Sequence, residues 1–127
     1  MKKVKILITS FAFILSCLFA IKAEESANSG IPKLVDLGAK KCIPCKMMAP
    51  ILDDLKANYA GTLDVEFIDV WLQENAPQAE KYGIRSIPTQ IFISPEGKEL
   101  FRHEGFFAKE DILAKWKELG FDLKPKA

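Results

Sequence analysis

The order of strand-like and helix-like stretches constrains the fold of this chain more than any other feature. A short apolar stretch at 33–39 is followed by a helix-patterned segment at 43–59 and by a β-branched, aromatic run at 63–71. A loop with a short helix then ends at Gly83, and a hairpin and a last helix follow. This order, β-α-β-α-β-β-α, predicts an α/β fold with a mixed central sheet and helices on both faces, because a βαβ unit pairs strands in parallel and a hairpin pairs them antiparallel.

Local patterns define the longer elements. Within 43–59, apolar side chains recur at steps of one, three and four residues: Met47, Met48, Ile51, Leu52 and Leu55. Pro50 lies inside this segment and is expected to kink the helix, because it has no N–H to donate. The hairpin strands are expected at 89–94 and 99–104 around "PEG". The last helix, at 108–120, has an apolar stripe made of Ile112, Leu113, Trp116 and Leu119.

The beginning of the chain has the pattern of an export signal. Three lysines, at positions 2, 3 and 5, precede an almost unbroken apolar run over 6–21, and Ala23 is followed by the polar "EESANSG". We therefore expect the protein to work in the periplasm or in another extracytoplasmic compartment.

Three regions follow from this pattern. Residues 1–23 are predicted to be a signal peptide or, if they are not cleaved, an N-terminal membrane anchor, since the apolar run is only slightly short of a spanning helix. Residues 24–32 are assigned to a linker and 33–127 to the folded domain. Lipid attachment at Cys17 is a further alternative, although the apolar "LFAI" after it argues against it.

Length, charge and cysteine content narrow the classes of function. The 127 residues fit one domain, and the net charge of +1 gives no sign of a nucleic-acid surface. Without residues 1–23 the chain has 14 basic and 17 acidic residues, a net charge of about −3, and keeps only Cys42 and Cys45. A small exported domain held together by disulfides has more cysteines, at wider spacing.

The cysteine pair lies in "KKCIPCK", and three roles are open to it. Tetrahedral zinc needs four ligands, and the remaining histidine, His103, lies far along the chain in an expected strand. A two-thiolate site for Cu(I) stays open. A purely structural disulfide is disfavoured, because so short a loop restricts the unfolded chain very little.

Redox chemistry fits the pair best. Cys42 lies where a helix begins, and the free N–H groups and positive dipole end of that helix favour a thiolate. Lys40, Lys41 and Lys46 add positive charge, which solvent screens. A thiolate attacks disulfides, and Cys45, one turn further on, can resolve the mixed disulfide that forms.

Two stretches of the chain resemble the thioredoxin family. "VDLGAKKCIPCKMMAPILDDL" is similar to the active-site segment of thioredoxins, and "EKYGIRSIPTQIFISPEGKEL" is similar to their second diagnostic stretch. The resemblance covers about 34–119 and implies a thioredoxin fold and thiol–disulfide exchange.

The resemblance also implies roles for single residues. Cys42 corresponds to the attacking cysteine, Cys45 to the resolving cysteine, and Asp36 to the buried carboxylate that accepts the Cys45 proton. Read without the resemblance, Asp36 is a turn residue at a strand end. Burial would raise its pKa. Pro88 corresponds to the family's cis-proline. The residues expected to contact the substrate chain are Pro88, Ile87, Ile43, Pro44 and Lys41.

The chain departs from the family pattern at several positions. Lys41 stands where thioredoxins usually carry tryptophan, Gly38 replaces an aromatic residue, and Ile43 replaces the usual glycine between the cysteines. The run at 63–71 has no lysine, whereas many thioredoxins place one near the buried aspartate. We expect the surface around the cysteine pair to be less apolar and more positively charged than in thioredoxins, and the substrate preference to differ.

These features predict an exported thiol–disulfide oxidoreductase without a bound cofactor. The dipeptide containing Pro44 resembles that of reductants, so we expect a monomeric protein-disulfide reductase that receives electrons from a membrane partner. The alternatives are a disulfide oxidase or isomerase, and a copper carrier that uses the same two thiolates.

Overall fold

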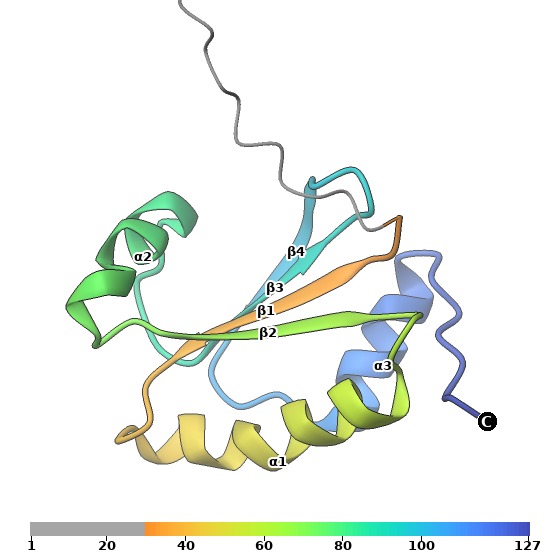
Figure 1. Cartoon of the computed structure of the whole chain (residues 1–127), viewed down its shortest axis with the longest axis horizontal. Helices are drawn as coiled ribbons and strands as arrows, with labels where there is room; N and C mark the ends of the chain where they lie inside the picture. Colours follow the sequence, from red (N-terminus) through yellow and green to blue (C-terminus); the bar gives the residue numbers. More distant parts are fainter. Residues whose placement is uncertain (1–29) are drawn as a thin grey trace, which may run out of the picture.

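The structure is a computed structural model, and it describes residues 30–127 (Figure 1). The expected signal segment, Cys17 and most of the expected linker lie outside the described residues. The strands are β1 (Lys33–Gly38), β2 (Asp64–Asp69), β3 (Thr89–Ile93) and β4 (Glu99–Glu104). The helices are α1 (Ile43–Asn58), η1 (Gln73–Asn75, a 3₁₀ turn), α2 (Ala76–Tyr82) and α3 (Lys109–Glu118). Over 30–127, no helix has both the length and the apolar character needed to cross a membrane.

The four strands form one mixed sheet in the order β2-β1-β3-β4. β1 pairs with β2 in parallel, and β3 pairs antiparallel with both β1 and β4. The element order and the mixed sheet are as the sequence predicted, with η1 as an addition. The parallel pair brings the carboxyl ends of β1 and β2 to one edge, where β1 continues into α1 (Figure 1).

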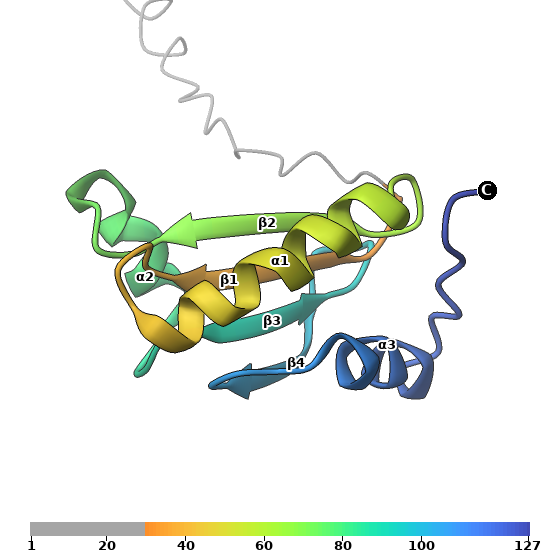
Figure 2. The same cartoon turned by 90° about the horizontal axis from the view of Figure 1, so that it is seen from below.

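Helices cover both faces of the sheet, as predicted. α1 and α3 pack on one face, and α2 lies on the other side near the carboxyl ends of β1 and β2 (Figures 1 and 2). In β1 the side chains alternate, so that Leu34 and Asp36 face α1 while Val35 and Leu37 face away. This alternation places Asp36 on the same face as the helix that begins at the cysteine pair.

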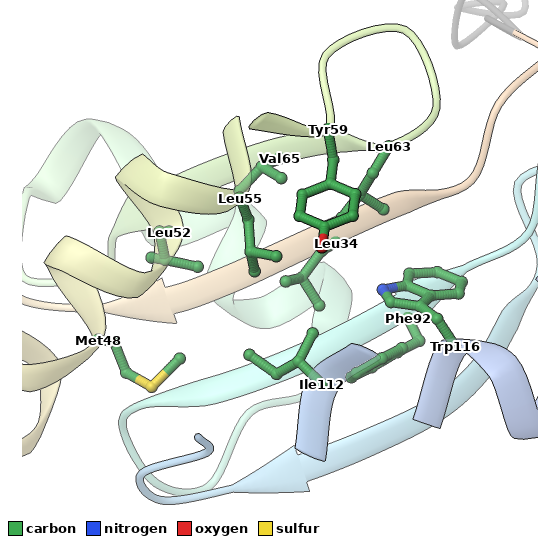
Figure 3. Packing of buried hydrophobic residues seen from close by; sticks show 10 residues of the cluster. All are labelled: Leu34, Met48, Leu52, Leu55, Tyr59, Leu63, Val65, Phe92, Ile112 and Trp116. Atoms are coloured by element: carbon green, nitrogen blue, oxygen red, sulfur yellow. The ribbon is translucent and has the colours of Figure 1, made fainter. Parts of the chain in front are cut away.

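The larger core lies between the sheet and the helices α1 and α3 (Figure 3). Its buried residues are Leu34, Met48, Leu52, Leu55, Tyr59, Leu63, Val65, Phe92, Ile112 and Trp116. Burial of each large apolar side chain contributes about 1.5–3 kcal/mol. A smaller cluster of Val35, Leu37, Ile68 and Ile91 lies on the other face, beside Tyr82.

The helix ends follow their sequence signals, with one correction. Gly83 ends α2 with a φ of 57°, a left-handed conformation that glycine adopts without strain. Met47 was expected on the apolar face of α1, but its side chain is 52% exposed. Met48, which was also expected there, is buried. The two side chains point in different directions, because consecutive residues of a helix lie about 100° apart around its axis.

Candidate active site

Cys42 and Cys45 lie at the start of α1 and form a disulfide with a Cα–Cα distance of 5.2 Å. Cys42 is the N-cap, with extended backbone angles, and its Sγ accepts a hydrogen bond from the Cys45 N–H at 3.4 Å. Pro44 occupies the first turn, where the missing N–H is not needed. The backbone therefore directs an amide donor at the Cys42 sulfur.

The two sulfurs have different environments. Cys42 is partly exposed, whereas Cys45 is only 3% exposed and packs inside the first turn. After reduction, the helix N-terminus favours a thiolate at Cys42, because unpaired N–H groups and the dipole stabilise negative charge there. The sulfur that solvent can reach is also the one that the helix activates.

Asp36 is fully buried and lies within β1, in its fourth position, so it is a strand residue and not a turn residue at the strand end. Its Oδ1 accepts a 2.7 Å hydrogen bond from Nε2 of Gln90, and its Oδ2 has no hydrogen-bond partner among the described residues. Burial raises the pKa of Asp36 from 3.8 to about 6, and the Gln90 hydrogen bond opposes that rise. A carboxyl group with this pKa can take up or release a proton near neutral pH.

Asp36 belongs to a row of side chains that crosses all four strands. It pairs with Phe67 of β2 and with Gln90 of β3, and Gln90 pairs with His103 of β4. His103 is half-buried, stacks on Phe107 at a centroid distance of 4.0 Å and lies 3.1 Å through Nε2 from the carbonyl oxygen of Phe106. His103 is thus an ordinary strand residue that packs against a neighbouring side chain, as expected.

Gly38 lies directly against the buried cysteine. A Cβ at this position would be 3.3 Å from Sγ of Cys45 and 3.1 Å from Cε2 of Phe67. Phe67 occupies the strand where the sequence lacks a lysine. Beside these residues is a pocket of about 270 Å³, lined by Ala39, Lys40, Cys45, Lys46, Ala49, Leu52, Asp53 and Phe67. Because position 38 carries no side chain, Cys45 lies between Gly38 and this pocket.

The Ile87–Pro88 peptide bond is cis, in agreement with the resemblance. Pro88 immediately precedes β3, and Thr89 pairs with Leu37 at the end of β1, so Pro88 lies at the same edge of the sheet as the cysteines. Pro88 is buried and Ile87 half-buried, while Lys41, Ile43 and Pro44 are exposed. The fold thus brings the predicted substrate-contacting residues to one edge.

Asp69 was not predicted as a site residue, yet it connects the loop before Cys42 with the loop after β2. Its Oδ2 accepts from the Lys40 N–H at 3.3 Å, and its Oδ1 accepts from the Trp71 N–H at 3.1 Å. Its carbonyl oxygen accepts from Nδ2 of Asn75 at 2.9 Å. An aspartate at a strand end followed by a loop is a sequence signal for such bonds, which hold the loop before Cys42.

Residues 30–127 contain no group of three or more histidine, cysteine, aspartate or glutamate side chains that could hold a metal ion. His103 belongs to β4, and its ring contacts Phe107 and Phe106.

Comparison with known proteins decides the family. The family model for thioredoxin matches residues 22–118. The chain belongs to the thioredoxin family. It is 40% identical over 89 residues to the thioredoxins of Staphylococcus aureus (strain Mu50 / ATCC 700699) and Staphylococcus haemolyticus (strain JCSC1435), a match that covers 70% of this chain and 82% of each relative.

A solved structure described as a malarial protein is similar to this thioredoxin-family chain, with a TM-score of 0.63 and 25% identity. The match covers 69% of this chain and 96% of that structure. The family and the disulfide at the start of α1 together make this protein a thiol–disulfide oxidoreductase with Cys42 and Cys45 as its redox pair.

Proposed function

We propose that this thioredoxin-family oxidoreductase is a protein-disulfide reductase of the periplasm or another extracytoplasmic compartment. The observation that carries the proposal is the asymmetry of the cysteine pair. Cys42 is partly exposed at a helix N-terminus, and Cys45 is buried behind it on the side of Asp36. Such a pair can attack a protein disulfide with one sulfur and release the product with the other.

The reaction has two exchange steps. In the first, the Cys42 thiolate attacks one sulfur of the substrate disulfide, and the other substrate sulfur leaves as a thiolate that takes a proton from solvent. In the second, Cys45 loses its proton, and its sulfur attacks Sγ of Cys42. The Cys42–Cys45 disulfide forms, the second substrate thiol is released, and two electrons have passed to the substrate.

The surface around Cys42 supports an extended polypeptide as the substrate. Ile43 is 74% exposed and Phe106 is 43% exposed. Phe106 follows Gly105, whose N–H donates to the carbonyl oxygen of Pro88 at 2.8 Å, so the backbone that carries this aromatic residue lies next to Pro88. Exposed apolar side chains beside the cysteine pair and beside the Pro88 loop can hold the apolar segments of a disulfide-containing protein chain.

Pro44 between the cysteines supports the direction of exchange, since such dipeptides resemble those of reductants. A reductase in an oxidising compartment needs a supply of electrons from elsewhere, and we propose a membrane partner as the donor. The export pattern at the start of the chain supports this location. Cleavage of the signal segment would release the domain, whereas an uncleaved anchor or lipid attachment at Cys17 would hold it at the membrane. The dithiol itself carries the two electrons, so we propose a monomer without a bound cofactor.

The reduction potential of the pair is the decisive measurement. Equilibration with dithiothreitol or glutathione is expected to give a value close to the roughly −270 mV of thioredoxin, far from the roughly −120 mV of a strong oxidase. Wild-type protein should catalyse reduction of insulin disulfides by dithiothreitol, and Cys42→Ser should not. A potential near that of an oxidase, or stoichiometric retention of Cu(I) without insulin reduction, would contradict the proposal.

Location is tested separately. A full-length protein with a C-terminal epitope tag is expected in the periplasmic or membrane fraction of a bacterial host. Recovery of the uncleaved, soluble chain from the cytoplasm would refute the extracytoplasmic assignment and leave the redox chemistry untouched.

A further inference from the structure

Gln90 is a polar residue in a strand that is otherwise suited to an apolar interior. β3 reads "TQIFI", and the Gln90 side chain is fully buried. An apolar side chain of similar size would fill this space without removing an amide from water. The one side-chain hydrogen bond of Gln90 within residues 30–127 goes from Nε2 to Oδ1 of Asp36, its partner across the β1–β3 pair. The amide is therefore best explained by the carboxyl group that it contacts.

The hydrogen bond from Gln90 makes the two carboxyl oxygens of Asp36 different from each other. Oδ1 is held by Gln90, while Oδ2 has no hydrogen-bond partner among the described residues. Oε1 of Gln90 is likewise buried without a partner in that part of the chain. An amide donor carries no titratable proton, so it fixes the carboxyl group and leaves Oδ2 as the oxygen able to bind one.

The surroundings of Asp36 contain few other groups that could control its charge. α1 contributes the redox cysteines, of which Cys45 contacts Gly38, two residues from Asp36 on the same face of β1. β2 contributes the apolar Phe67, which pairs with Asp36. Apart from burial, the influence on the Asp36 charge comes from Gln90. The remaining titratable side chain in the row is His103 of β4, which is beyond Gln90 and bonded to Phe106.

We propose that Gln90 is a positioning residue that sets the pH range in which Asp36 accepts the proton of Cys45. The inference rests on the reductase function proposed above. In the mixed disulfide, the proton passes from Sγ of Cys45 to Oδ2 of Asp36, and the Cys45 sulfur attacks Sγ of Cys42. The bond to the substrate sulfur breaks, and that sulfur leaves with the electron pair and takes a proton from solvent. Donation from Gln90 stabilises the carboxylate, so that Asp36 remains a base at a lower pH than burial alone would allow.

The test uses Gln90→Leu, which keeps the approximate size of the side chain and removes the donor. The rate of substrate release from the mixed disulfide is measured by rapid mixing from pH 5 to pH 9. The midpoint of its pH profile is expected to rise by about one unit, which corresponds to about a tenfold slower release on the acid side and little change at high pH. Ile91→Val, a buried change on the opposite face of the same strand, is the matched control and should leave the midpoint in place.

Two further measurements separate positioning from a merely structural role. In an Asp36→Asn background, Gln90→Leu should not move the profile further, because the group that it acts on is gone. NMR titration of the Asp36 carboxyl carbon in the reduced protein should show a higher pKa in Gln90→Leu than in wild type. If Gln90→Leu does not fold, Gln90→Met removes the same donor with a more flexible side chain.

The proposal is overturned if the Gln90→Leu profile superimposes on that of wild type, if its shift persists with Asn at position 36, or if the Asp36 titration is unchanged. The NMR titration needs no substrate. A wild-type protein that reduces no protein disulfide would therefore refute the proposed function, while the Asp36 titration would still decide the role of Gln90.

Discussion

A Cβ atom on Gly38 would lie only 3.3 Å from the Sγ of Cys45, so the backbone of β1 directly contacts the buried sulfur of the redox pair. The ring of Phe67 approaches the same point to 3.1 Å. A Cβ at position 38 requires one of these groups to shift by a few tenths of an ångström. Because Cys45 is held by the disulfide and by α1, the partly exposed Phe67 ring is the group that can move.

Gly38→Ala is accordingly expected to destabilise the oxidised protein by about 1–3 kcal/mol, the usual cost of overpacking a filled site. The same substitution should cost less in a Phe67→Ala background, where the space beside Gly38 is open. Urea unfolding of the four proteins in this double-mutant cycle measures the coupling. Equal costs in both backgrounds would show that Phe67 does not limit the space.

Asp36→Asn is expected to stabilise the oxidised protein at neutral pH. Burial raises the pKa of Asp36 from 3.8 to about 6, so the folded state binds this proton more tightly than the unfolded state. Stability therefore falls as the pH rises from about 4 to about 6 and is constant above that range. A pKa difference of about two units corresponds to roughly 3 kcal/mol of unfolding free energy. Asp36→Asn should therefore be more stable than wild type by about this amount at pH 7, and should show no such difference below pH 4.

The amide of Asn at position 36 could also donate to Oε1 of Gln90, which has no partner among the described residues. Urea unfolding between pH 3.5 and pH 8 is the measurement. Asp53→Asn, on the exposed side of α1, is the control and should change stability by less than about 0.5 kcal/mol at any of these values. A stability difference for Asp36→Asn that does not depend on pH would contradict the assignment of this titration.

Asp69→Ala is expected to loosen the loop that leads to Cys42. The substitution removes acceptors for the N–H groups of Lys40 and Trp71, both partly buried bonds. Unsatisfied donors of this kind cost about 1–3 kcal/mol, although solvent near the loop will reduce the loss. Hydrogen exchange at the two amides should accelerate, whereas exchange in β3 should follow only the change in global stability. Unchanged exchange at both amides would show that Asp69 does not hold the loop.

Local patterns in the sequence were enough to predict most elements. Glu99–Glu104 was expected as a strand and is β4, and Gly83 was expected to close the short helix and does so with a positive φ. These features depend on a few neighbouring residues, since turn chemistry and hydrophobic period are local properties. The pairing of Cys42 with Cys45 was predictable for the same reason, because both lie in one helical turn.

The environment of Asp36 was only partly predictable. Its burial was expected from the resemblance, but the contact with Gln90 depends on the register of β1 against β3, and a shift by one residue would point Gln90 to the opposite face. The approach of Phe67 to Gly38 depends in the same way on β1 and β2. Patterns along a single strand do not contain this register, so the row from Phe67 to His103 became visible only in the structure.

The cysteines are expected to differ in reactivity once the disulfide is reduced. Cys42 is partly exposed and its sulfur accepts the Cys45 N–H, so the helix N-terminus should favour its thiolate form. Cys45 is buried beside Gly38, where packing favours the neutral thiol. Iodoacetamide should therefore modify Cys42 first, and mass spectrometry of peptides after short exposure measures the order.

The single cysteine variants extend this asymmetry to the reaction with substrates. Cys42→Ser should abolish exchange, because the remaining sulfur is buried. Cys45→Ser should still attack and then stall, since no second thiol is present to displace the substrate from Cys42. The stalled species should migrate on a non-reducing gel as mixed disulfides with partner proteins and disappear on reduction, and the double variant should capture none. Capture by Cys42→Ser and not by Cys45→Ser would show that Cys45 attacks and Cys42 resolves. Burial would then not be what keeps the resolving sulfur protonated until the substrate has been attacked.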